Sequence, residues 1–300
     1  MPDNAAIVSA IQLLKSAAEV SRQRRLLVLA GDKEWSSAVI AEYLAEAAET
    51  IVSSKLVWIG EQPNLPQLQS MPSSKARQLL GQEVELLIYD GWSGIDADAL
   101  AASSGAIAGG GLFILLLPTL SSLTAFLDPQ YQRLLVYPYT LEHINARFLA
   151  RLQHYIATDK ALLLIEQGQA VPQQKIPVKT ASPLIASPDH CLTADQSQAV
   201  AAIMSVQRGH SRRPLVISSD RGRGKSSALG IAAAELLEQG IQTITVTAPS
   251  RQSVVALFDQ VSRLLGVDSA NKNSINYHQS QLIFAALMNS SAISPIPIYC

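Results

Sequence analysis

The stretch Ser219-Asp220-Arg221-Gly222-Arg223-Gly224-Lys225-Ser226-Ser227 decides the fold of the second half of this chain. It follows an apolar run, Leu215 to Ile217, and leads into an alanine-rich pattern that is typical of a helix. Glycines let a backbone turn tightly with its amides pointing inward, a lysine reaches the β- and γ-phosphates, and the next serine ligates Mg²⁺. The stretch therefore predicts a nucleotide-phosphate loop, to which the dipole of the following helix adds positive potential.

One position departs from the usual pattern, because Ser219 stands where G-x-x-x-x-G-K-[ST] has its first glycine. The context supports the site, since a strand is predicted to end at Ser218 and a helix to run from Ser226 to Gly240. The alternative is an ordinary glycine-containing turn. We favour the phosphate site, with Ser226 as the Mg²⁺ ligand, and assign to it Ser219, Asp220, Arg221, Gly222, Arg223, Gly224, Lys225, Ser226 and Ser227.

The composition is that of a globular chain with room for two domains. Of its 300 residues 48% are apolar and 16% charged, and its formal net charge is −1. Nucleic-acid binding would therefore depend on local basic patches, and the cluster Arg208, His210, Arg212 and Arg213 is one, although we favour a solvated loop there. The two cysteines predict no disulfide and favour a reducing cytoplasm, and no apolar run is long enough to span a membrane.

Short apolar strands alternate with helices through the first half of the chain. Strands are predicted at residues 26–29, 56–59, 86–89 and 112–117, and helices at residues 1–20, 38–48, 73–80 and 141–156. Strands that alternate with helices in this way favour a doubly wound parallel sheet. The sequence therefore predicts an α/β domain over residues 1–165.

Two glycine-aspartate turns follow predicted strands, where doubly wound sheets often bind ligands. They are Gly31-Asp32 and Asp90-Gly91-Trp92-Ser93-Gly94. A binding crevice is the alternative, but we favour ordinary turns at both, because no acid–base or nucleophile set accompanies them. Gly109-Gly110-Gly111 is interpreted as a hinge that precedes the strand at residue 112.

A boundary is predicted in residues 166–190, which are rich in Pro, Gln and Ser and lack periodicity. The next domain opens with Leu192-Thr193-Ala194-Asp195-Gln196, in which Thr193 and Gln196 stand at capping-box positions. The alternative role for Gln196 is recognition of adenine, because an amide can donate and accept hydrogen bonds at once. The residues alone leave these two roles open.

The strand-helix unit occurs a second time after the phosphate loop. A β-branched run, Ile241 to Thr247, is followed by Thr247-Ala248-Pro249-Ser250 and by a helical pattern that extends to Leu265. In nucleic-acid motors the loop at this place commonly touches the phosphate backbone, so Thr247, Ser250 and Arg251 are candidate RNA contacts. The alternative is that they form the N-cap region of the helix.

These motifs together carry a family likeness. Leu192-Thr193-x-x-Gln196, Asp220-Arg221-Gly222-Arg223-Gly224-Lys225-Ser226 and Thr247-Ala248-Pro249-Ser250 resemble the helicase-like module of bacterial tRNA(Met) cytidine acetyltransferases, the TmcA family. The stretch from Asp90 to Leu100, followed by Gly109-Gly110-Gly111-Leu112, is similar to the accessory domain that precedes this module. The likeness covers residues 1–283 and is most specific in the phosphate loop.

The resemblance implies an enzyme that uses ATP and acetyl-CoA to acetylate N4 of the wobble cytidine of elongator tRNA(Met). It implies that Gln196 contacts adenine, that Gly222, Gly224, Lys225 and Ser226 hold the triphosphate and Mg²⁺, and that Arg221 and Arg223 add charge beside them. ATP hydrolysis would drive a rearrangement of RNA or domains. The implied fold is a doubly wound parallel-sheet domain followed by an incomplete P-loop, RecA-like α/β domain over residues 191–283.

Several parts of the family pattern have no counterpart in these residues. The first is a strand ending in Asp-Glu after Leu265, where the aspartate would hold Mg²⁺ and the glutamate would orient water. The others are the acetyltransferase domain, which would bind acetyl-CoA, and the C-terminal tRNA-binding part. Residues 284–300 form an apolar, proline-broken tail, and we hypothesise that the reading frame changes near Phe284. This chain is therefore expected at most to bind ATP. The alternatives are a non-catalytic ATP- or RNA-binding module and a fragment of a DNA helicase.

Overall fold

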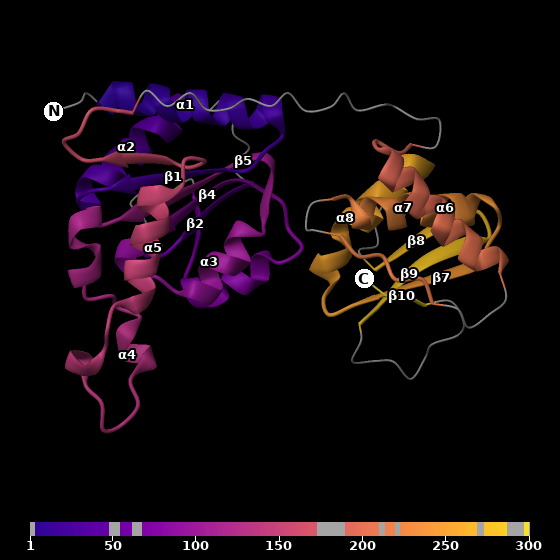
Figure 1. The fold of residues 1–300 in the computed structure, drawn as a ribbon. Coiled ribbons are helices and arrows are strands. Elements are labelled where there is room, and N and C mark those ends of the chain that lie inside the picture. Colours follow the sequence, from indigo (N-terminus) through magenta and orange to yellow (C-terminus); the bar gives the residue numbers. More distant parts are fainter. Residues whose placement is uncertain are drawn as a thin grey trace. The chain divides into compact units, whose positions relative to one another are not determined.

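The structure is a computed structural model that describes residues 4–47, 55–61, 68–172, 190–209, 214–219, 223–268, 273–286 and 297–299. The chain divides into two units, Met1–Ala181 and Ser182–Cys300, called unit 1 and unit 2 below (Figure 1). The predicted linker 166–190 lies largely outside the described residues. None of the described helices is long and apolar enough to cross a bilayer.

Unit 1 is built on a six-stranded sheet in the order β3-β2-β4-β5-β1-β6, in which every neighbouring pair is parallel. The continuous apolar runs of its central strands suit burial on both faces. Its strands are β1 (Arg25–Ala30), β2 (Leu56–Ile59), β3 (Gln69–Met71), β4 (Val84–Asp90), β5 (Ile107–Leu117) and β6 (Leu163–Glu166).

Helices cover both faces of this sheet, each over its own apolar core. Helices α1 (Asn4–Ser21) and α2 (Lys33–Glu46) pack on one face. The other face is covered by α3 (Ala97–Ser104), α5 (Arg147–Thr158) and the short turns η2 (Ser73–Leu79) and η4 (Leu120–Ala125). This arrangement confirms the predicted doubly wound parallel sheet.

The prediction of a hinge at Gly109-Gly110-Gly111 was wrong, because all three glycines lie inside β5. Gly110 has φ +88°, and a Cβ placed there would lie 3.2 Å from the Glu19 Cα of α1. The missing side chain lets the helix backbone approach the strand closely. Gly110 therefore serves the packing of α1 against the sheet.

A second difference lies before α5. The helix predicted over residues 141–156 begins only at Arg147, and two short elements precede it, α4 (Tyr131–Leu134) and η5 (Leu141–His143). Neither short element has a buried residue. Residues 131–146 project from the body of unit 1 and are called the lobe below (Figure 1).

Unit 2 has a four-stranded sheet in the order β10-β7-β9-β8, in which only β8 and β9 are antiparallel. The strands are β7 (Thr243–Ala248), β8 (Ser274–Tyr277), β9 (Ser280–Ala286) and β10 (Pro297–Tyr299). Its helices are α6 (Ala194–Arg208), α7 (Lys225–Glu238) and α8 (Val255–Leu265), and the turn η6 (Arg251–Val254) leads into α8. They pack around a shared core that includes Ile231, Val246 and Phe258.

The strand predicted just before the phosphate loop is not formed. Residues 214–219 have no regular secondary structure, and Leu215 and Val216 are 42% and 83% exposed. Strand β7 is paired on both sides, to β9 and β10, so this run has no place beside it. Ile217 alone of the apolar run packs against the core of unit 2.

The predicted tail 284–300 is only partly described. Phe284 lies within β9, residues 297–299 form β10 beside β7, and residues 287–296 and 300 lie outside the described residues. The hypothesis of a changed reading frame is not tested by these elements.

Candidate functional site

Helix α7 of unit 2 begins at the predicted phosphate loop. Its N-cap is Gly224, whose φ of +81° lies in the left-handed region that favours glycine. The first hydrogen bond within the helix runs from the Ala228 amide to the Gly224 carbonyl, 2.9 Å away. The loop thus turns into the helix where the motif predicts, while Asp220, Arg221 and Gly222 lie outside the described residues.

The side chain of Lys225 folds back across this turn. Its Nζ donates to the carbonyl of Ser219 and lies 3.2 Å from the Ser219 Oγ. The ammonium is therefore held at the mouth of the loop, with both ends of the predicted motif in contact. A point charge with three donors is suited to phosphate oxygens at this place.

The first turn of α7 supplies the remaining groups of the loop. Ser226 and Ser227 are half-buried there, and Arg223 just before them is exposed. The first amides of a helix have no partners within it, and they carry the positive end of the dipole. The turn can therefore receive an anion, and the Ser226 hydroxyl is the oxygen donor there that suits a hard cation.

Gln196 reaches the loop from helix α6. Thr193 is the N-cap of this helix, and its Oγ1 accepts from the Gln196 amide at 3.2 Å, as a capping box requires. The return bond is different, because the Gln196 Oε1 accepts from the amide of Leu192 at 2.8 Å. A Cβ at Gly224 would lie 3.4 Å from the Gln196 Nε2, so this amide stands directly beside the phosphate loop.

The three candidate RNA contacts differ in exposure. Thr247 is 2% exposed within β7, whereas Ser250 is exposed, with its Oγ 3.0 Å from the Ser253 Oγ. The guanidinium of Arg251 lies over the ring of Phe258, 4.2 Å from its centre, and burial lowers its pKa. The predicted contact with RNA stays a prediction, and Ser250 is the best placed of the three to make it.

A cleft in unit 1 lies at the Asp90–Gly94 turn, where the sequence left a binding crevice open but an ordinary turn was favoured. It has a volume of about 410 Å³ and opens at the carboxyl ends of β2 and β4. Polar side chains in its lining include Glu61, Ser73, Ser93, Gln130 and Arg133.

The turn after β4 nevertheless shows the expected turn chemistry. The carboxylate of Asp90, 2% exposed, accepts from the Trp92 amide at 3.0 Å and from the Ser93 hydroxyl. A Cβ at Gly60 would lie 2.6 Å from the Asp90 Cβ, so a glycine at the end of β2 lets the two turns meet. The glycine-aspartate pairing across neighbouring strand ends was the available signal for the cleft.

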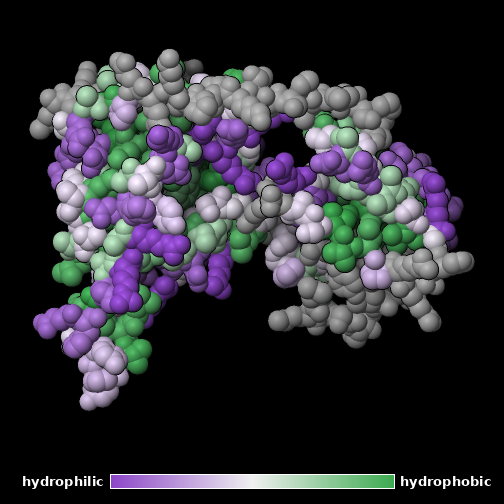
Figure 2. All heavy atoms as spheres, viewed as in Figure 1, coloured by the Kyte–Doolittle hydropathy of each residue, from purple (hydrophilic) through white to green (hydrophobic). Residues whose placement is uncertain are grey.

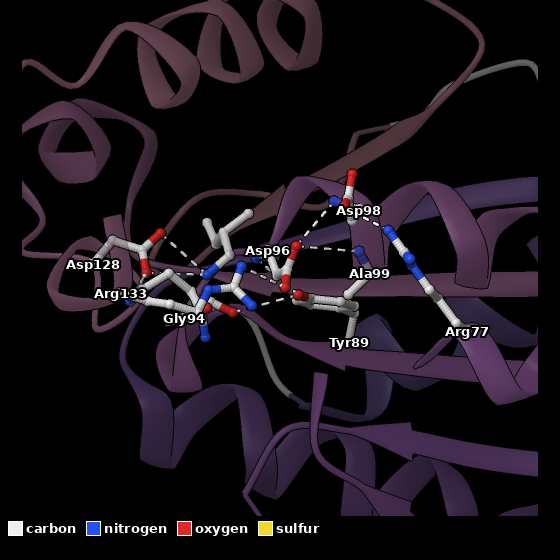
Figure 3. A network of polar contacts seen from close by, with 10 residues as sticks. Arg77, Tyr89, Gly94, Asp96, Asp98, Ala99, Asp128 and Arg133 are labelled. Carbon is white, nitrogen blue, oxygen red and sulfur yellow. Dashed lines mark hydrogen bonds and ion pairs between the residues drawn. The ribbon is translucent and has the colours of Figure 1, made fainter. Parts of the chain in front are cut away.

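A network of buried carboxylates supports one wall of the cleft (Figure 3). Asp96 caps α3 through the amides of Asp98 and Ala99, and its Oδ2 lies 2.8 Å from the Arg133 Nη2. The hydroxyl of Tyr89 accepts from the Asp96 amide at 3.0 Å, and burial raises the pKa of Tyr89 to about 12. The network ties the base of the lobe to the sheet.

Asp128 gives this network a pH dependence. It is 4% exposed, and burial raises its pKa above the ordinary 3.8, although hydrogen bonds from the Gln130 and Ile95 amides oppose the shift. A carboxyl with a raised pKa in the folded state stabilises the fold when protonated, and this contribution is lost as the pH rises through the raised pKa.

We therefore expect wild type to lose stability relative to Asp128→Asn, which does not titrate, as the pH rises from 3.8 toward neutrality. Unfolding free energies from urea titrations of both proteins at each pH measure the effect. Titration of the groups that both proteins share cancels in the difference between the two unfolding free energies. A difference that does not change with pH would contradict the raised pKa.

Comparison with known proteins identifies both units. The family model described as "tRNA(Met) cytidine acetyltransferase TmcA, N-terminal" matches residues 1–167, and "RNA cytidine acetyltransferase NAT10/TcmA, helicase domain" matches residues 216–293. The first match alone covers more than half of the chain.

Curated relatives agree with these matches. A tRNA(Met) cytidine acetyltransferase TmcA from Nitrosococcus halophilus is 38% identical over 280 residues, which are 91% of this chain and 36% of that protein. Proteins of the same name from Haloferax volcanii and Vibrio cholerae are each 30% identical, over 88% and 86% of this chain. The chain spans about a third of the length of these relatives and belongs to the tRNA(Met) cytidine acetyltransferase TmcA family.

Proposed function

We propose that this chain is the ATP-binding, N-terminal portion of an enzyme that uses acetyl-CoA to form N4-acetylcytidine at the wobble position of elongator tRNA(Met). One observation carries the proposal. A lysine and a left-handed glycine at the start of α7 meet a glutamine amide contributed by α6. These are the groups that a purine nucleoside triphosphate needs at its phosphates and at its base.

Each group has a separate task in holding ATP. The amides of the first turn of α7 and the Lys225 ammonium receive the phosphates, while Ser226 supplies a hydroxyl ligand to Mg²⁺. Gln196 stands at the same loop and pairs with the adenine edge. When bound, ATP supplies through its hydrolysis the free energy for rearranging RNA or domains.

The tRNA and acetyl-transfer parts of the proposal rest on the family. The relatives are named for acetylation of cytidine in tRNA(Met), and the cytoplasm is where we place such a reaction. Ser250 and Arg251 follow β7 at the place where the RNA backbone would pass. The acetyl-CoA site would lie in the two thirds of the relatives' length that this chain does not cover.

A chimaera tests the whole proposal. Residues 1–293 of this chain, the span of the two family matches, replace the matching third of the Nitrosococcus halophilus relative, which is 38% identical to this chain over 280 residues. We expect the purified chimaera to form N4-acetylcytidine in a tRNA(Met) transcript when ATP and acetyl-CoA are present, as read by nucleoside mass spectrometry. The isolated chain should form none.

The unaltered relative is the positive control, and a melting curve shows whether the chimaera is folded. A folded chimaera that binds ATP but leaves the transcript unmodified would overturn the proposed function. A chimaera that acetylates equally well without ATP would overturn the role given to the nucleotide.

A further inference from the structure

The segment Tyr131–Thr158 of unit 1 has an unusual composition. It holds four of the chain's eight tyrosines and three arginines, but only one of the 24 acidic residues, Glu142. The chain as a whole balances its charges to a net −1. Positive charge and aromatic rings are therefore concentrated together in this one segment.

Helix α5 arranges part of this segment into two faces. Leu149 and Ile156 are buried against the core of unit 1. The opposite face is exposed and is called the arginine–aromatic face, made of Arg147, Phe148, Arg151, His154 and Tyr155. Phe148 and Tyr155 remain 44% and 53% exposed, so two large rings are accessible on the face opposite the buried one.

Contacts within this face pair cations with rings. The guanidinium of Arg151 lies 5.5 Å from the centre of the Tyr155 ring, and its Nη2 is 3.4 Å from the Tyr155 hydroxyl. The ring of His154 lies 5.8 Å from that of Tyr155. The twelve residues of α5 include no carboxylate, so within α5 no acidic side chain neutralises these arginines.

The lobe continues the same chemistry beyond the start of α5. Tyr137 and Tyr139 are 96% and 62% exposed, and the ring of Tyr139 meets that of His143 at 5.6 Å. Figure 2, seen from the same side as Figure 1, shows strongly hydrophilic residues on the outside of α5, while the lobe exposes hydrophobic residues beside hydrophilic ones.

We propose that the arginine–aromatic face binds an unpaired segment of RNA. Arginines contact phosphates without regard to sequence, and exposed rings stack on bases, which are accessible only where RNA is single-stranded. Arg147 and Arg151 would hold two phosphates, while Phe148 and Tyr155 would stack bases. The proposal rests on the proposed function only for the identity of the RNA, a tRNA.

The absence of acidic residues from α5 favours RNA over a protein partner. A protein partner would need carboxylates placed opposite these arginines. RNA needs no such placement, because any two successive phosphates can pair with them. The separation of Arg147 and Arg151 by one helical turn, about 6 Å, matches the spacing of neighbouring phosphates along a strand.

The test is RNA binding by the full chain in the absence of nucleotide. The probes are a fluorescent twelve-nucleotide single-stranded RNA and a tRNA(Met) transcript. Arg147→Ala/Arg151→Ala should weaken both roughly tenfold, and should reduce the slope of log affinity against log salt by about 1.4 for the single strand, since two phosphate contacts are lost.

The matched control is Lys55→Ala/Arg77→Ala, which removes two positive charges elsewhere in unit 1. Both control side chains are exposed and paired, with Glu85 and Asp98. This control variant should bind within about twofold of wild type. Equal losses in the two double variants would show an effect of net charge alone and would overturn the proposed face.

Aromatic variants test stacking separately from charge. Tyr155→Ala should weaken the single strand roughly tenfold, Tyr155→Phe should restore binding, and a duplex RNA of equal length should be insensitive to both. If Phe148→Ala and Tyr155→Ala change the oligomeric state in sedimentation but leave RNA affinity unchanged, the face is a protein contact and the proposal fails. Loss of ATP binding with RNA binding intact would affect only the proposed function.

Discussion

Replacement of Lys225 by alanine is expected to weaken the binding of Mg²⁺-ATP roughly 10- to 100-fold while the chain stays folded. The ammonium is held at the loop mouth by the carbonyl and hydroxyl of Ser219, where it can exchange these contacts for phosphate oxygens. Charge-assisted hydrogen bonds to phosphate are about twice as strong as neutral ones. Their loss should therefore lower the affinity for ATP and leave the stability of the fold unchanged. Fluorescence titration with a labelled ATP analogue measures the effect.

The control is Lys55→Ala, which removes the same charge from an exposed pair with Glu85 in unit 1. Exposed pairs of this kind contribute little to stability, so both variants should melt close to wild type. If the ATP titration curves of wild type and Lys225→Ala superimpose while their melting temperatures agree, the assignment of the phosphate loop is wrong.

Hydrophobic pattern was sufficient to predict the architecture of unit 1. The runs around Val28 and Ile88 are apolar without alternation, which is the signature of strands buried on both faces, and both lie at 0% exposure. The cap at Thr193 was also predictable, because an N-cap depends on residues within one turn. Local signals of this kind survive because few distant contacts compete with them.

Signals that depend on distant partners were missed. Three glycines at residues 109–111 read as a hinge, yet they lie inside β5, where the backbone of α1 approaches Gly110 closely. The run Leu215 to Ile217 has the composition of a strand, but β7 pairs with β9 and β10 instead. A strand forms only where a neighbouring strand pairs with it through backbone hydrogen bonds. Residues near a run in the sequence do not determine which strand that neighbour is.

The candidate sites also include features that were predictable from local sequence and features that depend on residues far apart in the chain. The motif placed Gly224 and Lys225 correctly at a helix start, because a glycine turn that leads into a helix is a local structure. For the cleft of unit 1 the sequence indicated the Asp90 turn but not its partner, because Gly60 and Asp90, at the ends of β2 and β4, meet only after the sheet has formed.

Replacement of Gln196 by glutamate is expected to abolish most of the preference of the chain for ATP over GTP, with a loss of roughly tenfold or more in ATP affinity. The amide can donate from Nε2 and accept at Oε1, as the adenine edge requires, whereas a carboxylate only accepts. The Oε1 contact with the Leu192 amide, at 2.8 Å, survives in the variant. Competition titrations with both nucleotides against the same labelled probe measure the ratio of affinities.

GTP is the internal control, because a negative charge beside Gly224 would repel the phosphates of both nucleotides alike, while only adenine recognition changes their ratio. The competing role, a helix cap, leads to a different result. Gln196 is the third residue of α6 and is 9% exposed, so the favourable interaction of a carboxylate with the helix dipole is opposed by its desolvation, and a pure cap would change stability but keep the nucleotide ratio. A variant with an unchanged ratio would therefore assign Gln196 to the fold of unit 2 and leave adenine to other residues.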